Sequence, residues 1–217
     1  MRPLYNAANS RYLTLLLLLV TALLAITLLG APTLSGGVMW DAANTLGFIA
    51  FAGMLYLFVD VGRGERNRFH QIVSYGAAAA LAAHVGWLLA ADRTIWHYLS
   101  PDAPPYMLTG LIALLLLSTI IVLALPRWRR IWQQRFRNFQ RWHYWLSLCA
   151  IMMGGYHIWG SNFYISGFIE TAAFLALSGT VVLVHRLGRH YPRGNTATLW
   201  AVPAIGIAFV LLKWGMA

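Results

Sequence analysis

"HYWLSLCAIMMGGYH", residues 143–157, is an apolar stretch with a histidine at each end. With its flanking residues it is long enough to cross a bilayer as a helix, which takes about 20 mostly apolar residues. Histidine is costly inside a membrane, so the presence of both His143 and His157 needs a reason. A second stretch, "HQIVSYGAAAALAAH", places His70 and His84 at the same separation of fourteen residues.

This separation puts both histidines of a stretch on one helix face. Fourteen residues at about 100° each turn a helix through about 1400°, close to four full turns, and raise it by about 21 Å. If the two helices run parallel, each of two levels in the membrane holds one histidine from each helix. The pattern predicts two facing pairs, His70 with His143 and His84 with His157.

The composition around these stretches is that of a membrane protein. Of the 217 residues, 59% are hydrophobic and 10% are charged, whereas about 25% of a soluble domain is charged. The first apolar run is longer than the hydrophobic core of a signal peptide, so we expect it to be a retained helix. The sequence predicts seven transmembrane spans and no separate soluble domain. The expected spans are roughly 12–29, 45–61, 69–90, 107–125, 142–159, 168–184 and 199–214.

The distribution of basic residues predicts the orientation. Fourteen of the sixteen Lys and Arg residues lie before the first span or in the segments after the second, fourth and sixth. Because cytoplasmic loops are enriched in Lys and Arg, we expect a cytoplasmic N-terminus and a C-terminus outside. The histidine stretches then run parallel, with His70 and His143 at the inner level and His84 and His157 at the outer level. We expect Asp41, Asp92 and Asp102 to lie outside or at that edge.

Two neutral imidazoles at each level suit the iron of a six-coordinate haem. A zinc site needs three or four ligands close together, and a proton relay would mix acids into the spans. With one cysteine and no CxxCH motif, covalent haem attachment is excluded. Small residues beside the histidines could let a porphyrin approach, although such residues also serve helix packing. The interpretation we prefer is two b-type haems. The small residues are those of "YGAAAALAA", residues 75–83 on the third span, and Ser147, Cys149, Ala150, Gly154 and Gly155 on the fifth.

Several cationic and aromatic residues are candidates for contacts with these haems. Arg68 and Arg141 each precede an inner histidine by two residues and could bind its haem propionates. Arg93 is the nearby cation at the outer level, with Trp87 and Trp159 as packing or relay groups. An equally good interpretation is that Arg68 and Arg141 anchor their helices at lipid phosphates.

The remaining histidines and the longest basic segment have simpler interpretations. We expect His97, His185 and His190 to lie at the membrane interface, because no other span offers a partner at their depth. The basic and aromatic segment 126–142 is typical of an interfacial helix. It could also be a docking face for an acidic cytoplasmic redox partner, and the two roles are compatible.

The four histidines and the predicted topology resemble the ferric reductase-like transmembrane domain superfamily. That family includes ferric reductases, NADPH oxidases and the membrane haem subunit of the bacterial methionine sulfoxide reductase system. Its third and fifth helices carry paired histidines at this spacing, matched here by His70 and His84 and by His143 and His157. The resemblance covers roughly residues 10–187. It implies an all-α integral membrane fold, a six-helix diheme cytochrome b-type bundle with a cytoplasmic N-terminus.

The chain departs from the oxidases and many ferric reductases after the sixth span. A cytoplasmic FAD and NAD(P)H module follows there in those proteins, whereas this sequence leads into the seventh span with no nucleotide-binding fingerprint. We therefore expect a diheme domain at 1–190 and an additional helix at 191–217. The donor would be a separate cytoplasmic flavin/NAD(P)H reductase or quinol, and the acceptor would lie in the periplasm or outside the cell.

Three functions stay open on the sequence alone. The first is an oxidoreductase component in a bacterial inner membrane that transfers electrons through two haems to the outer side. The second is a membrane-anchor cytochrome b subunit that exchanges electrons with quinone in a larger respiratory complex. The third is a small transporter or structural membrane protein without haem.

Overall fold

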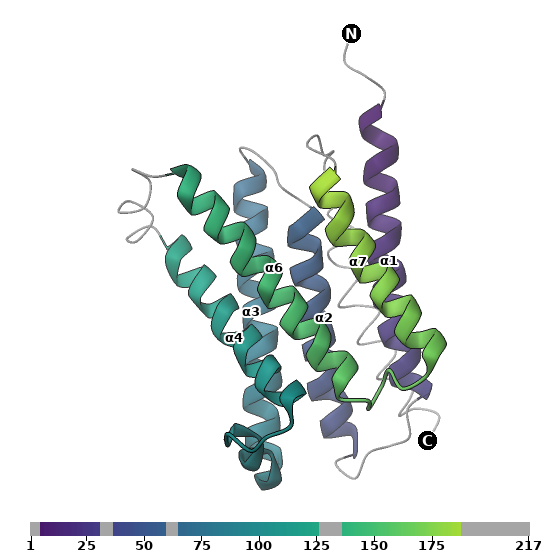
Figure 1. Cartoon of the computed structure of the whole chain (residues 1–217), viewed down its shortest axis with the longest axis vertical. Coiled ribbons are helices and arrows are strands. Elements are labelled where there is room, and N and C mark those ends of the chain that lie inside the picture. Colours follow the sequence, from purple (N-terminus) through teal and green to yellow (C-terminus); the bar gives the residue numbers. More distant parts are fainter. Residues whose placement is uncertain (1–4, 31–36, 60–64, 126–135, 188–217) are drawn as a thin grey trace.

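The computed structural model describes residues 5–30, 37–59, 65–125 and 136–187, and every regular element in these ranges is a helix. The seventh expected span, 199–214, lies outside the described residues. Figure 1 shows the long helices as one bundle. They are α1 (Tyr5–Gly30), α2 (Gly37–Val59), α3 (Glu65–Ala91), α4 (Pro105–Ala124), α6 (Phe136–Gly160) and α7 (Phe168–Leu187), with the short 3₁₀ helix η1 (Arg93–Leu99) between α3 and α4.

The lengths and compositions of three helices indicate a helical membrane protein. Gly37–Leu57, His70–Ala91 and Pro105–Ala124 are each long and apolar enough to cross a membrane. Two further apolar stretches, Leu17–Gly30 and Phe168–Leu183, are shorter. Helix α6 is as long as the three spans, but His, Trp, Tyr and Gly replace many of the aliphatic residues found in them.

Local signals fix several helix ends around the histidine helices. Helix α4 begins at Pro105, where a missing backbone N–H is harmless because the first turn has no acceptor for it. Asp92 caps η1 by accepting a hydrogen bond from the Thr94 backbone N–H at 2.8 Å. Between α6 and α7, Asn162 adopts a positive φ of 55°, and Glu170 accepts hydrogen bonds from the backbone N–H groups of residues 166 and 167.

The start of α2 corrects the sequence prediction. The second span was expected from about residue 45, with Asp41 outside the membrane or at its outer edge. The helix instead begins at Gly37, and Asp41 lies within it with none of its surface exposed. A hydrogen bond from the Tyr164 hydroxyl, far along the chain, helps to make this burial possible.

Four helices surround the space between the histidine stretches. Helix α2 packs along α3, and α4 packs along α6, with smaller contacts from α2 to α6 and from α3 to α4. Helices α3 and α6 therefore face one another diagonally. Phe51 of α2 is buried beside Gly154 of α6 and contacts the ring of Phe174 in α7. Phe51 therefore fills the core between α2, α6 and α7. The backbones of α3 and α6 do not pack along one another, and their histidine side chains reach across the space between them.

Candidate functional site

The four histidines of α3 and α6 meet as two pairs. The ring centroids of His70 and His143 lie 6.2 Å apart, with the ring planes inclined by 48°. The ring centroids of His84 and His157 lie 6.4 Å apart, with an inclination of 72°. We name them the inner pair (His70 and His143) and the outer pair (His84 and His157), after the sides that the arginine distribution predicts.

The separations within both pairs fit one metal ion bound between two imidazole rings. A metal–imidazole bond of about 2.0 Å on each side, with about 1.2 Å from nitrogen to ring centroid, places the centroids about 6.4 Å apart. Within the described residues, no group of three or more His, Cys, Asp or Glu could hold a metal ion. The two imidazoles that the helices bring together in each pair could hold the iron of a haem.

Backbone carbonyls fix the tautomer of both outer histidines. The Nδ1 atom of His84 lies 2.7 Å from the carbonyl oxygen of Ala43, and that of His157 lies 2.8 Å from the carbonyl oxygen of Tyr106. A carbonyl oxygen can only accept, so Nδ1 carries the hydrogen in each ring. In a neutral imidazole this leaves Nε2 with a free lone pair, the form in which histidine binds a metal.

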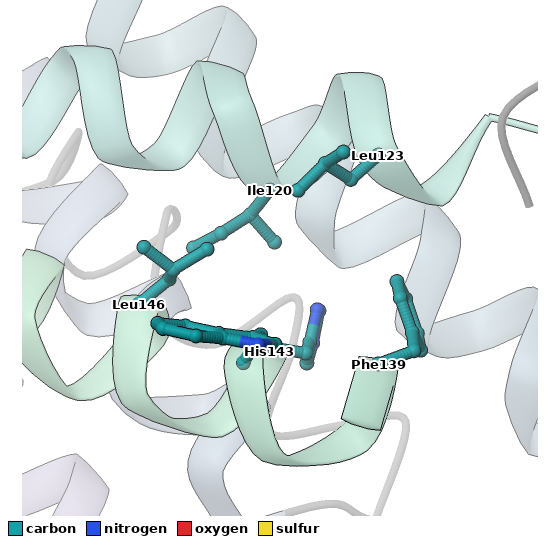
Figure 2. Close-up of a pocket in the computed structure, with 6 residues that line it drawn as sticks. Ile120, Leu123, Phe139, His143 and Leu146 are labelled. Atoms are coloured by element: carbon teal, nitrogen blue, oxygen red, sulfur yellow. The ribbon is translucent and has the colours of Figure 1, made fainter. Parts of the chain in front are cut away.

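The inner pair adjoins an apolar cavity of about 200 Å³ between α4 and α6. Figure 2 shows His143 pointing from α6 into this space, with Ile120 and Leu123 of α4 on the opposite side. Phe139 lies one turn before His143, and the two ring centroids are 5.6 Å apart. The other residues that line the cavity are Trp142 and Leu146. Its walls could cover part of a flat apolar ligand held by the inner pair.

No protein-family model, no curated protein and no solved structure matches this chain.

A buried polar network, which the sequence did not predict, lies beside the outer pair. The Tyr164 hydroxyl donates to Asp41 Oδ1 at 3.1 Å, and Asn44 Nδ2 donates to the Tyr164 oxygen at 2.9 Å. Burial, and then the neighbouring Asp41 carboxylate, raise the pKa of Tyr164 above its ordinary value. The network joins α2 to the segment between α6 and α7, next to Ala43. Tyr164 lies 123 residues from Asp41 and 120 from Asn44 in sequence, so no local pattern could reveal these contacts.

The other predicted site residues lie around the pairs without closing over them. Arg141 and Arg93 are exposed, and Trp87 and Trp159 are each about two-fifths exposed. Arg68 belongs to α3, but its side chain lies outside the described residues. Their roles in holding a cofactor stay predictions.

The remaining histidines are not part of either pair. His97 is exposed in η1. The side chain of His185 and the whole of His190 lie outside the described residues, so their expected place at the interface stays a prediction.

Proposed function

We propose that this chain is a transmembrane electron-transfer subunit that holds two b-type haems. The inner haem would be bound by His70 and His143, and the outer haem by His84 and His157. One observation carries the proposal: the four histidines meet as two pairs with ring centroids 6.2 and 6.4 Å apart, a separation that would leave room for one iron in each pair. A bundle without a cofactor has no evident reason to place four histidines in this way.

The haems would supply one-electron redox chemistry, and the chain would hold them and control their surroundings. Helices α3 and α6 each carry one ligand for each level, so their rigidity sets the spacing of the two sites. Fourteen residues of helix correspond to a rise of about 21 Å. The edges of the two porphyrins would be closer than this, so electrons could pass from one haem to the other. One haem would lie near each side of the membrane.

The direction of transfer follows from the expected orientation. With the arginine-rich end in the cytoplasm, electrons would reach the inner haem from a separate flavin/NAD(P)H reductase or from quinol. They would leave from the outer haem to an acceptor on the opposite side. This role corresponds to an oxidoreductase component of the ferric reductase-like type, in a bacterial inner membrane.

Purification from haem-sufficient cells tests the proposal. The reduced-minus-oxidised spectrum should show the α band of b-type haem, and a haem assay should give about two haems per chain. A folded but colourless preparation would contradict the proposal. Reduction by a soluble flavoprotein reductase would identify the expected donor, whereas reduction only by quinol would favour a quinone-linked cytochrome b subunit.

A further inference from the structure

The two carbonyls that accept hydrogen bonds from the outer histidines have the same sequence context. Ala43 of α2, which binds His84, is followed four residues later by Gly47. Tyr106 of α4, which binds His157, is followed four residues later by Gly110. Two different helices therefore present a carbonyl and a glycine, one helical turn apart, to the two rings of one pair.

Both glycines lie directly against a histidine ring. A Cβ atom added to Gly110 would lie 2.7 Å from Nδ1 and 3.0 Å from Cε1 of His157. One added to Gly47 would lie 3.2 Å from both Nδ1 and Cε1 of His84. The first distance is shorter than real contacts allow, and the second requires the ring to shift by a few tenths of an ångström. Among the described glycines, these two alone meet a histidine ring.

Helix geometry explains why a glycine is needed at this place. The carbonyl of residue i already accepts from the N–H of residue i+4, and its second lone pair is open to side-chain donors. At Tyr106 the Thr109 hydroxyl also donates to this oxygen, at 2.8 Å, so it shares the carbonyl with His157. A ring that reaches this lone pair from the side lies over residue i+4. Any side chain there occupies the volume of the ring, so glycine leaves the carbonyl open to it.

We propose that Gly110 and Gly47 are positioning residues for the outer haem ligands, an inference that rests on the proposed function. Each glycine admits a histidine ring to the carbonyl one turn earlier, and that hydrogen bond holds Nδ1 as donor and Nε2 as ligand. Donation from Nδ1 also makes the ligand nitrogen more basic. A more basic ligand stabilises the ferric state, so the two carbonyls lower the reduction potential of the outer haem.

Single substitutions in the full-length protein test this proposal. Gly110→Ala should lower the haem content from about two per chain to about one, with the inner haem spectrum retained. Gly47→Ala, with the looser contact, should keep both haems. A redox titration should show a higher reduction potential for the outer haem, because the hydrogen bond from His84 to Ala43 is weakened. Gly86→Ala is the matched control, because Gly86 lies two residues from His84 but has nothing within 4 Å of an added Cβ. If Gly110→Ala and Gly47→Ala both behave like Gly86→Ala, the proposal is wrong.

A double variant separates positioning from general packing and needs no haem. Gly110→Ala should lower the unfolding temperature of the otherwise unaltered chain more than Gly86→Ala does. In a His157→Ala background the ring is absent, so Gly110→Ala should change the unfolding temperature only as Gly86→Ala does, because each replaces a glycine within a helix by a better helix former. An equal loss in both backgrounds would overturn the proposal. If the unaltered chain holds no haem, the proposed function fails, while this comparison still shows whether Gly110 makes room for His157.

Discussion

The inner and outer pairs have the same spacing in sequence and nearly the same ring separation, but different surroundings. The outer rings are held by two backbone carbonyls, and His84 is only 8% exposed. The ring of His143 instead lies against Phe139 and an apolar cavity. The equal spacing of the histidines on α3 and α6 therefore produces two similar histidine pairs. The surroundings of each pair depend on the neighbouring helices.

This difference predicts a division of work between the two sites. Hydrogen bonds from Nδ1 restrain the rotation of the outer rings and raise the basicity of their ligand nitrogens. At the inner pair, the packing of α4 against α6 shapes the space around His143. We therefore expect haem binding at the outer pair to depend on substitutions that block the Ala43 or Tyr106 carbonyl. Haem binding at the inner pair should depend on substitutions that change the volume of the cavity.

The largest expected effect is the loss of one site without the other. His84→Ala should remove the outer haem and His143→Ala the inner haem, because each leaves one imidazole where two are needed. Each variant should bind about one haem per chain, with different residual spectra. Loss of both haems from either variant, in protein that is still folded, would show that the two levels are not independent.

A smaller effect is expected from filling the inner cavity. Leu146→Trp would place a bulky ring in the cavity beside His143, so it should reduce occupancy of the inner site and leave the outer site unchanged. The haem content and the redox titration measure this. Leu115→Trp on α4 is the control, because Leu115 is 66% exposed and the same addition there meets little of the protein. Equal effects of the two variants would mean that the cavity has no part in the inner site.

The polar network beside the outer pair should contribute mainly to stability. Tyr164→Phe removes the hydroxyl between Asp41 and Asn44 and leaves buried polar groups short of a partner, a change that costs about 1–3 kcal/mol. Thermal unfolding in detergent should show this loss. The control is Tyr75→Phe, since that side chain is 49% exposed. A stability equal to that of the control would mean that the rest of the network compensates.

The smallest expected effect is a dependence of stability on alkaline pH. The raised pKa of Tyr164 means that the unfolded chain, in which tyrosine has a pKa of about 10, releases the phenolic proton before the folded chain does. The contribution of Tyr164 to the free energy of unfolding is therefore fully present below pH 10 and decreases as the pH rises above 10. The slope of stability against pH above 10 should be smaller in Tyr164→Phe, and identical slopes would exclude this linkage.

The sequence by itself determined the helical class, the three long apolar helices and the placing of two histidines on one face of each of two helices. These follow from the helical period and from side-chain hydrophobicity, which are properties of short stretches of chain. Only the tertiary structure decided that Asp41 is buried, that a cavity adjoins His143, and which residues restrain the outer pair. The carbonyls of Ala43 and Tyr106 lie 41 and 51 residues from the histidines they bind. Contacts at such separations depend on which helices pack together, and that depends on the sum of many weak interactions throughout the bundle.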